Sequence, residues 1–194
     1  MHEEAKNFLL YAKNNFENYF KNIKVLDVGS GDINGNNRYL FTDCEYEGND
    51  VIEGKNVTIV SRTKDLKFEN NFFDTIISSE CFEHDPEYKQ SLKKIYAMLK
   101  PNGLFVFTCA STNRPEHGTR RTTKTDSLGT IGEIEDMQDY YKNLTKHHIN
   151  EVLNLNEKFS YHEMYYNKQS CDLYFVGIKK INDYEETNTI KIIK

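Results

Sequence analysis

The chain contains no tryptophan and only three prolines among its 194 residues, and it has no long apolar run. A membrane-spanning helix needs about 20 consecutive apolar residues. The longest runs here, such as residues 8–12 and 104–107, are much shorter. The N-terminus also lacks the basic start and continuous apolar stretch of an export signal. We therefore expect a cytoplasmic protein without a membrane span.

Cysteine is scarce, and no two cysteines form the Cys-x-x-Cys pair that is typical of a zinc site or a redox couple. The four cysteines are widely spaced, at Cys44, Cys81, Cys109 and Cys171. We therefore expect free thiols, most of them buried.

Positive charge is in deficit, because 25 Lys and Arg stand against 30 Asp and Glu, for a formal net charge of −5. A protein that binds nucleic acid by neutralising phosphates normally carries the opposite excess. The composition therefore disfavours nucleic acid as a partner. The length suits one domain, which we expect at residues 1–181, followed by a loosely ordered tail at residues 182–194.

Seven segments are predicted as strands, and the principal ones do not alternate apolar and polar residues. They cover residues 24–28, 45–49, 57–60, 72–79, 103–110, 159–166 and 172–179. Helical patterns cover the first twenty residues, residues 34–41, 86–99 and 134–141, and the stretch after Thr145. Strands without alternation that are followed by helices indicate a parallel sheet buried on both faces, so the predicted fold class is α/β.

A polar segment of about two dozen residues follows Ala110, which is too long for an ordinary connection in a compact domain. We interpret it as a lid or a binding loop. Within it, residues 114–121 read Arg-Pro-Glu-His-Gly-Thr-Arg-Arg, a dense group of charges in an otherwise acidic chain. Guanidinium groups bind carboxylates and phosphates through paired hydrogen bonds. Arg114, Glu116, Arg120 and Arg121 are therefore candidate substrate residues.

The first predicted strand ends in the turn Gly29-Ser30-Gly31, where the backbone can approach a ligand closely. A dinucleotide-binding turn would place a third glycine at position 34, which is Asn. Asp27 precedes the turn, and its carboxylate would repel a pyrophosphate but attract a cationic amino-acid group. The pattern therefore favours a sulfonium nucleoside over NAD. Asp50 ends the second strand, where a carboxylate can accept hydrogen bonds from both hydroxyls of a ribose.

Together with residues 73–84, which end in Glu83-His84, and residues 99–103, these motifs resemble the class I S-adenosylmethionine-dependent methyltransferases. The resemblance covers residues 24–110 and is strongest to small single-domain members whose fourth strand is followed by Glu-His. It implies a Rossmann-like, seven-stranded, mostly parallel sheet with a reversed last strand and helices on both faces. Residues 114–121 are similar to those of bacterial and phage members that accompany glycan-modifying genes.

The resemblance implies S-adenosylmethionine as the cofactor and a set of residues that bind it: Asp27, Gly29, Ser30, Gly31, Asp50, Val51, Thr63, Ser79 and Glu80. One position departs from the family. Arg62 stands where many members have an acid that binds the adenine amino group, so we expect the backbone near Thr63, or Asp65, to contact adenine instead.

Methyl transfer to oxygen or nitrogen is an in-line displacement that also requires removal of a proton. The candidate bases are His84 and His117, although His84 could equally cap or pack under a loop. The segment with Glu80, Glu83 and His84 looks like one that binds magnesium in some ubiquinone-pathway and small-RNA 2'-hydroxyl methyltransferases. Mg²⁺ or another divalent cation is therefore a further hypothesis, with His117 completing the site.

The function predicted from the sequence is O-methylation of a sugar, a nucleotide sugar or another small polar or anionic acceptor. Three alternatives stay open: a metal-dependent methyltransferase of the terminal 2'-hydroxyl of RNA, a non-catalytic scaffold that binds the cofactor, and an NAD-dependent dehydrogenase. The sequence does not indicate an oligomeric state.

Overall fold

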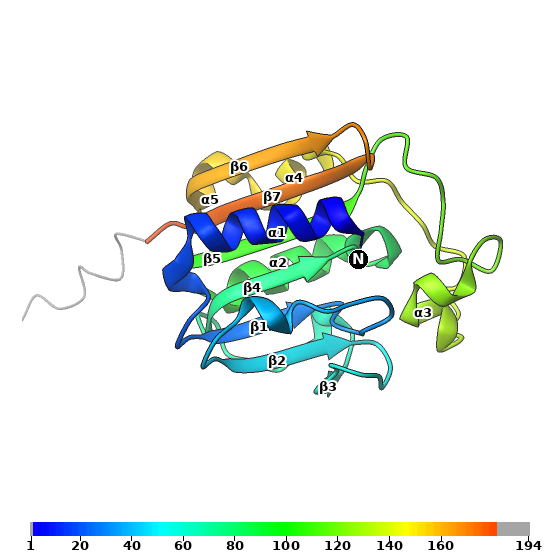
Figure 1. Cartoon of the computed structure of the whole chain (residues 1–194), viewed down its shortest axis with the longest axis horizontal. Coiled ribbons are helices and arrows are strands. Elements are labelled where there is room, and N and C mark those ends of the chain that lie inside the picture. The colour runs from blue at the N-terminus through cyan, green and yellow to red at the C-terminus, as the bar shows by residue number, and fades with distance from the viewer. Residues whose placement is uncertain (1, 182–194) are drawn as a thin grey trace, which may run out of the picture.

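The computed structural model describes residues 2–181, and its centre is a seven-stranded sheet in the order β3-β2-β1-β4-β5-β7-β6 (Figure 1). The strands are β1 (Lys24–Val28), β2 (Glu45–Asp50), β3 (Ile59–Val60), β4 (Phe73–Ser79), β5 (Leu99–Ala110), β6 (Phe159–Asn167) and β7 (Asp172–Lys179). Strands β1 to β5 are parallel, and β7 runs antiparallel to both β5 and β6. The predicted mostly parallel α/β sheet with a reversed last strand is confirmed. The predicted tail at residues 182–194 lies outside the described residues.

Neighbouring residues of each strand point to opposite faces of the sheet, so each face has its own apolar residues. Helices cover both faces. They are α1 (Glu3–Asn15), α2 (Tyr88–Met98), α3 (Leu128–Ile131), α4 (Lys146–Leu153) and α5 (Leu155–Lys158). Helix α1 packs on the face to which Val25 and Val106 point. Helices α2 and α4 pack on the face to which Leu26 and Phe105 point, so the central strands are buried on both sides. No helix of residues 2–181 has the length and apolar character to cross a bilayer.

The helix predicted at residues 34–41 is wrong, because only the short 3-10 helix Arg38–Leu40 forms there. The side chain of Asp32 accepts hydrogen bonds from the backbone N of Gly35 and from Nδ2 of Asn36, each at 2.8 Å. Such turns, built from a side chain and the nearby backbone, compete with helix formation. The chain therefore leaves β1 in an irregular loop.

The helix predicted at residues 134–141 is also absent, and this segment forms successive turns. Its apolar spacing reflects packing on a neighbour, because a Cβ atom at Gly129 in α3 would lie 2.9 Å from Cβ of Met137. The helix predicted after Thr145 is confirmed as α4, where Thr145 and His148 form a capping box. The polar segment after β5 is thus a long loop, residues 111–145, that carries α3.

Candidate functional site

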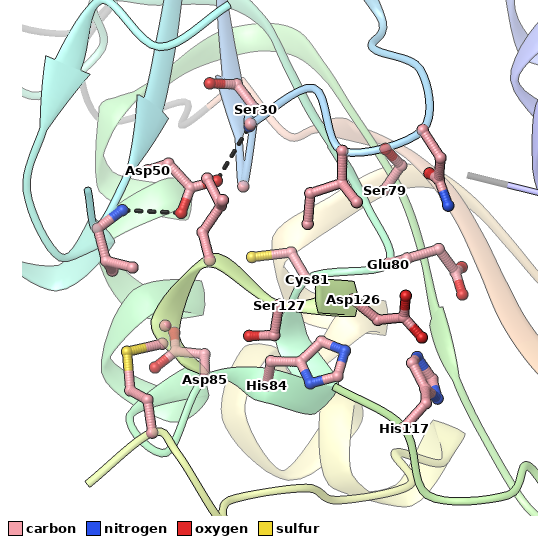
Figure 2. A pocket seen from close by; sticks show the side chains of 18 of the residues that line it. Ser30, Asp50, Ser79, Glu80, Cys81, His84, Asp85, His117, Asp126 and Ser127 are labelled. Carbon is pink, nitrogen blue, oxygen red and sulfur yellow. Dashed lines mark hydrogen bonds between the residues drawn. The ribbon is translucent and has the colours of Figure 1, made fainter. Parts of the chain in front are cut away.

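A pocket of about 380 Å³ lies at the carboxyl ends of β1, β2 and β4, which meet at one edge of the parallel sheet (Figure 2). The residues that follow these strands line one wall, and residues of the loop 111–145 line the other. Open α/β sheets bind ligands at this edge. The pocket is therefore the candidate functional site.

The turn after β1 requires glycine at two positions, because neighbouring side chains leave no space for a Cβ atom there. Gly29 has φ +71°, and a Cβ atom there would lie 2.5 Å from Cβ and Sγ of Cys81. A Cβ atom at Gly31 would lie 2.1 Å from Cδ1 of Leu128 and 3.0 Å from Oδ2 of Asp50. Because neither position accepts a side chain, bare backbone forms this part of the pocket wall.

Asp27 lies beneath this turn and is fully buried. Its carboxylate accepts hydrogen bonds from the hydroxyl of Tyr46 and, at 2.9 Å, from Nδ2 of Asn37. Burial raises the pKa of Asp27 to about 6. Asp27 therefore places a buried negative charge beneath the glycine turn.

Asp50 ends β2 and turns its carboxylate toward the glycine turn (Figure 2). Oδ2 accepts a hydrogen bond from the backbone N of Gly31 at 3.0 Å, and Oδ1 accepts one from the backbone N of Val51 at 2.8 Å. Burial raises the pKa of Asp50. Each carboxylate oxygen has a second lone pair, so Asp50 can still accept hydrogen bonds from two adjacent hydroxyls.

All the residues predicted to bind the cofactor line this one pocket: Asp27, Gly29, Ser30, Gly31, Asp50, Val51, Thr63, Ser79 and Glu80. Asp65, the alternative adenine contact, does not line it, whereas Arg62 does. The structure thus brings together residues from four separate segments, and their binding role stays a prediction.

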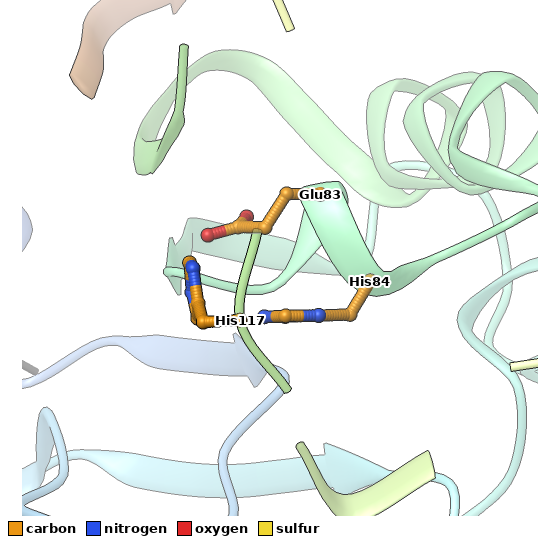
Figure 3. Close-up of side chains that lie close together, drawn as sticks. All are labelled: Glu83, His84 and His117. Carbon is orange, nitrogen blue, oxygen red and sulfur yellow. The ribbon is translucent and has the colours of Figure 1, made fainter. Parts of the chain in front are cut away.

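His84 and His117 line the other end of the pocket, and Glu83 lies close to both of them (Figure 3). One ligand-type atom of each lies within 4.8 Å of the others, and the two imidazole centroids are 4.9 Å apart. Glu83 and His84 belong to the 3-10 helix Phe82–His84 after β4, and His117 comes from the long loop. The two candidate bases, His84 and His117, therefore lie side by side.

Burial governs the protonation of two members of this cluster. Burial and the neighbouring His117 lower the pKa of His84 to about 3, so its imidazole is neutral near pH 7. Burial also raises the pKa of the Glu83 carboxyl well above its usual range. Oε1 of Glu83 accepts a hydrogen bond from the backbone N of Ala110 at 3.1 Å. Within the described chain, Oε2 of Glu83 and Nδ1 of His84 are buried without a hydrogen-bond partner, so they are the donor atoms left for a ligand.

His117 has a defined tautomer. Its Nδ1 lies 3.2 Å from the carbonyl oxygen of Pro115. A carbonyl only accepts hydrogen bonds, so Nδ1 carries the proton and Nε2 has the free lone pair of the neutral ring. His117 is therefore equipped to accept a proton at Nε2.

The predicted metal set of Glu80, Glu83 and His84 does not form as one group, because Glu80 belongs to a second cluster. Nε2 of His2 lies 2.8 Å from Oδ2 of Asp172 and 3.5 Å from Oε2 of Glu80. The hydrogen bonds to Asp172 and Glu80 raise the pKa of His2 to about 10. His2 is thus an imidazolium ion between two carboxylates.

The arginines of residues 114–121 all have acidic partners from the protein itself. Nη1 of Arg114 lies 3.3 Å from Oδ1 of the fully buried Asp172. Arg120 pairs with Asp139. Nε of Arg121 donates to Oε1 of Glu116 at 2.9 Å.

Of the four predicted substrate residues, Arg114 and Glu116 line the pocket. Arg120 and Arg121 do not, because their guanidinium groups lie in the ion-pair network within the loop. In this structure all three arginines are paired with acidic residues, and the substrate role of Arg114, Glu116, Arg120 and Arg121 stays a prediction.

Sequence reasoning missed four residues of this region. His2, Asp126 and Leu128 line the pocket, and Asp172 holds both His2 and Arg114. Asp172 alone carried a signal, as an acid at the start of an apolar strand. The others lie far in sequence from the groups they face, so no local pattern marks them.

Comparison with known proteins adds a family to this geometry. Residues 26–107 match the methyltransferase domain family. The sterol 24-C-methyltransferase of Candida albicans is 32% identical over 106 residues, which cover 45% of this chain and 28% of that protein. The chain thus spans less than a third of the length of this curated relative.

Solved structures share the fold at low identity. An N1-methyltransferase of 1,6-didemethyltoxoflavin from Burkholderia thailandensis, with S-adenosylhomocysteine bound, has a TM-score of 0.60 and 17% identity over 92% of this chain and 78% of that one. A phosphoethanolamine N-methyltransferase from Haemonchus contortus has a TM-score of 0.61 and 16% identity over 90% of this chain and 53% of that one. An S-adenosylmethionine-dependent methyltransferase from Aquifex aeolicus has a TM-score of 0.60 and 14% identity over 88% and 89% of the two chains.

Proposed function

Since the chain belongs to the class I S-adenosylmethionine-dependent methyltransferase family, we propose that it transfers the methyl group of S-adenosylmethionine to a hydroxyl of a small polar acceptor, a sugar or a nucleotide sugar. The observation that carries the proposal is the single pocket in which the glycine turn, Asp50 and the cluster of His84 and His117 meet. The first two suit a nucleoside amino acid, and the last suits proton removal.

The residues of the cofactor end fit S-adenosylmethionine. The bare backbone at Gly29 and Gly31 would admit the amino-acid part, and Asp50 would accept hydrogen bonds from the ribose hydroxyls. The negative charges of Asp27 and Asp50 favour a ligand with a positive sulfur. The cofactor supplies an electrophilic methyl group on that sulfur, and the protein has to align the acceptor and remove a proton.

His117 is the base in this proposal. His84 is a poor base because its pKa is lowered to about 3, and His2 is already protonated because its pKa is raised to about 10. Nε2 of His117 has a free lone pair, because Nδ1 bonds Pro115. Replacing His117 by Gln should lower kcat by a factor of about 10² to 10⁴ while cofactor affinity changes little. An unchanged kcat would remove His117 from the reaction.

A neutral polyol group, such as the sugar ring of the proposed acceptors, suits this end of the pocket better than a phosphate or a carboxylate group does. The lining cations Arg114 and His2 are paired with Asp172. The carboxylates of Glu80 and Asp126 also line this end, and they accept hydrogen bonds from hydroxyl donors. The relatives from Burkholderia and Haemonchus are described with small molecules, a toxoflavin precursor and a phosphorylated amine, which agrees with a small acceptor.

The test measures two steps separately. Calorimetry with S-adenosylhomocysteine and with NAD should show binding of the first and none of the second. Labelled S-adenosylmethionine is then supplied with pools of saccharides, nucleotide sugars and RNA, and label should enter the saccharide or nucleotide-sugar pool. Binding without label in any pool would favour the non-catalytic scaffold, and label in RNA would favour the alternative below.

A metal-dependent methyltransferase of terminal 2'-hydroxyls of RNA is the second candidate, and one observation favours it. Oε2 of Glu83 and Nδ1 of His84 are buried without hydrogen-bond partners beside His117, a mixed oxygen and nitrogen donor set that suits a divalent cation. Glu83, His84 and His117 would hold the ion, which would bind adjacent hydroxyls of the acceptor. Full activity in a chelator would retire this candidate, and loss restored by Mg²⁺ or Mn²⁺ would establish it.

A further inference from the structure

Arg62 lines the cofactor end of the pocket, yet its hydrogen bonds are directed away from it. Nη1 donates to Oε2 of Glu87 at 2.9 Å and to Oδ2 of Asp136 at 2.8 Å, and Nη2 donates to Oδ1 of Asp136 at 2.6 Å. The two contacts with Asp136 form a bidentate pair, the strongest geometry for arginine and a carboxylate. Arg62 therefore joins the end of β3 to the long loop.

Arginine cannot do the work of an acid at this position. The guanidinium group only donates hydrogen bonds, and the exocyclic amine of adenine also donates. Asp136 and Glu87 accept hydrogen bonds from the guanidinium group of Arg62, and these bonds raise the pKa of Arg62. The role of Arg62 therefore lies in its contact with the loop rather than in recognition of the adenine amine.

The part of the loop that Asp136 belongs to covers the cofactor end. Leu128 of α3 lies against Gly31, where a Cβ atom would come within 2.1 Å of its Cδ1 atom. A Cβ atom at Gly132 would lie 2.4 Å from Cγ2 of Ile52. Figure 1 accordingly shows α3 beyond the carboxyl ends of β1 and β2. These contacts are apolar and close, and the pair with Arg62 adds the charged contact on the same side.

A chain of contacts runs from Asp136 to the proposed base. The turn from residue 134 to 138 packs on α3, where Met137 meets Gly129. Oγ1 of the buried Thr130 then donates to the carbonyl oxygen of Gly118 at 2.5 Å. Gly118 follows His117 directly, and a Cβ atom there would lie 2.6 Å from Cε1 of His84. The position of His117 thus depends on how α3 is seated.

We propose that Arg62 is a positioning residue: its bidentate pair with Asp136 seats α3 and the following turn on the cofactor end, and thereby sets His117 opposite His84. The part of the proposal that concerns catalysis rests on the proposed function, whereas the seating of the loop does not. The pair is partly exposed, with side-chain exposures of 30% for Arg62 and 51% for Asp136. Its effect is therefore local and leaves global stability nearly unchanged.

The test replaces each side of the pair in turn. Arg62→Ala removes a residue that lines the pocket, and Asp136→Asn breaks the same pair from a residue that does not line it. Glu135→Gln is the matched control, because it removes one charge from the neighbouring position. Hydrogen exchange of the ligand-free protein is followed in peptides that cover residues 117–138.

Both Arg62→Ala and Asp136→Asn should speed exchange of the amides in α3 and the following turn by roughly three- to tenfold, with the unfolding midpoint unchanged. Arg62→Lys should restore part of the protection, and Glu135→Gln should match the wild type. If Arg62→Ala weakens S-adenosylhomocysteine binding in calorimetry while Asp136→Asn changes neither binding nor exchange, Arg62 acts on the cofactor directly and the proposal fails. If the wild type binds no S-adenosylhomocysteine, the proposed function fails, and the exchange data still decide whether the loop is seated by this pair.

Discussion

The pocket has two walls that are built by different means. The wall at the ends of β1 and β2 is held by hydrogen bonds between the neighbouring strand ends, such as the one from the backbone N of Gly31 to the side chain of Asp50. The wall formed by the loop 111–145 is held by ion pairs between residues far apart in sequence, such as Arg62 with Asp136. The first wall is rigid wherever the sheet is folded, whereas the second depends on charges that salt and pH can weaken.

This difference agrees with the tasks that the proposed function gives to the two walls. A cofactor common to a whole family needs the same contacts in each member, and strand ends supply them with little variation. An acceptor differs between members, and a loop on a rigid scaffold can vary without loss of the fold. Variants of the two walls should therefore fail in different ways.

The largest effect is expected at Asp172, where the loop, α1 and the sheet meet. Its fully buried carboxylate faces His2 and Arg114, so Asp172→Asn leaves two cations without their buried counter-charge. Breaking a buried pair costs about 3 to 5 kcal/mol of unfolding free energy. Urea unfolding measures this loss, and NMR titration should show the pKa of His2 falling from about 10 toward its usual range.

Asp126→Asn is the control for that experiment, because Asp126 is exposed and lines the same pocket. Its unfolding free energy should stay within about 0.5 kcal/mol of the wild type. Equal losses of unfolding free energy in the two variants would mean that the buried pairs of Asp172 do not hold the loop, α1 and the sheet together.

The second effect is a pH dependence that arises from His84. Its pKa is about 3 in the folded chain and near 6.5 when unfolded, so below pH 6.5 the unfolded state binds a proton that the folded state does not. His84 therefore lowers stability as pH falls from 6.5 toward 3, by at most about 1.4 kcal/mol per pH unit. Glu83 has a raised pKa and acts in the opposite direction, because its folded state keeps a proton that the unfolded state loses above the usual pKa.

The two contributions are separated by comparing the wild type with His84→Asn. The difference in unfolding free energy between these proteins should shift against the wild type as pH is lowered below 6.5, while the Glu83 contribution stays common to both. A difference that stays constant between pH 7 and pH 5 would contradict the neutral, buried state of His84.

The contrast between the walls also explains what the sequence could predict. Strand positions follow from local patterns, and Gly29, Gly31 and Asp50 could be singled out because they lie at the ends of the strands that carry them. The reversed last strand and the rest of the cofactor set follow from the resemblance to class I methyltransferases. The residues 34–41 were predicted as helical since their apolar spacing is local too, but the side chain of Asp32 forms a competing turn.

The loop wall could be recognised but not resolved. Residues 114–121 mark the loop by their charges, yet the partners of Arg120 and Arg121 include Asp139, whose place is fixed only by the folded loop. The partner of His2 is even harder to predict, because Asp172 lies 170 residues away in sequence, at the start of the last strand. The sequence shows which segments carry charged side chains. Only the folded structure shows which of these side chains have no partner within the protein and can bind a ligand.

A third prediction sharpens the rigid wall. Asp50→Ala removes both backbone contacts and the proposed acceptor of the ribose hydroxyls, so S-adenosylhomocysteine affinity should fall at least about tenfold, or about 1.4 kcal/mol. Calorimetry measures the affinity, and Asp65→Asn serves as the control because Asp65 does not line the pocket. Unchanged affinity in Asp50→Ala would take Asp50 out of the cofactor site.

The smallest effect is expected in the loop wall, at a residue with charge but no place in the pocket. Arg120 pairs with Asp139, and its side chain is 53% exposed. Exposed ion pairs contribute little to stability, so Arg120→Ala should leave the urea unfolding midpoint nearly unchanged and S-adenosylhomocysteine affinity within about twofold. If Arg120→Ala instead raised the KM of an acceptor strongly while leaving the cofactor untouched, Arg120 would leave Asp139 when the acceptor binds. The arginines of the loop would then bind an anionic group of the acceptor in place of their partners in the protein, and a neutral polyol would no longer be the better fit.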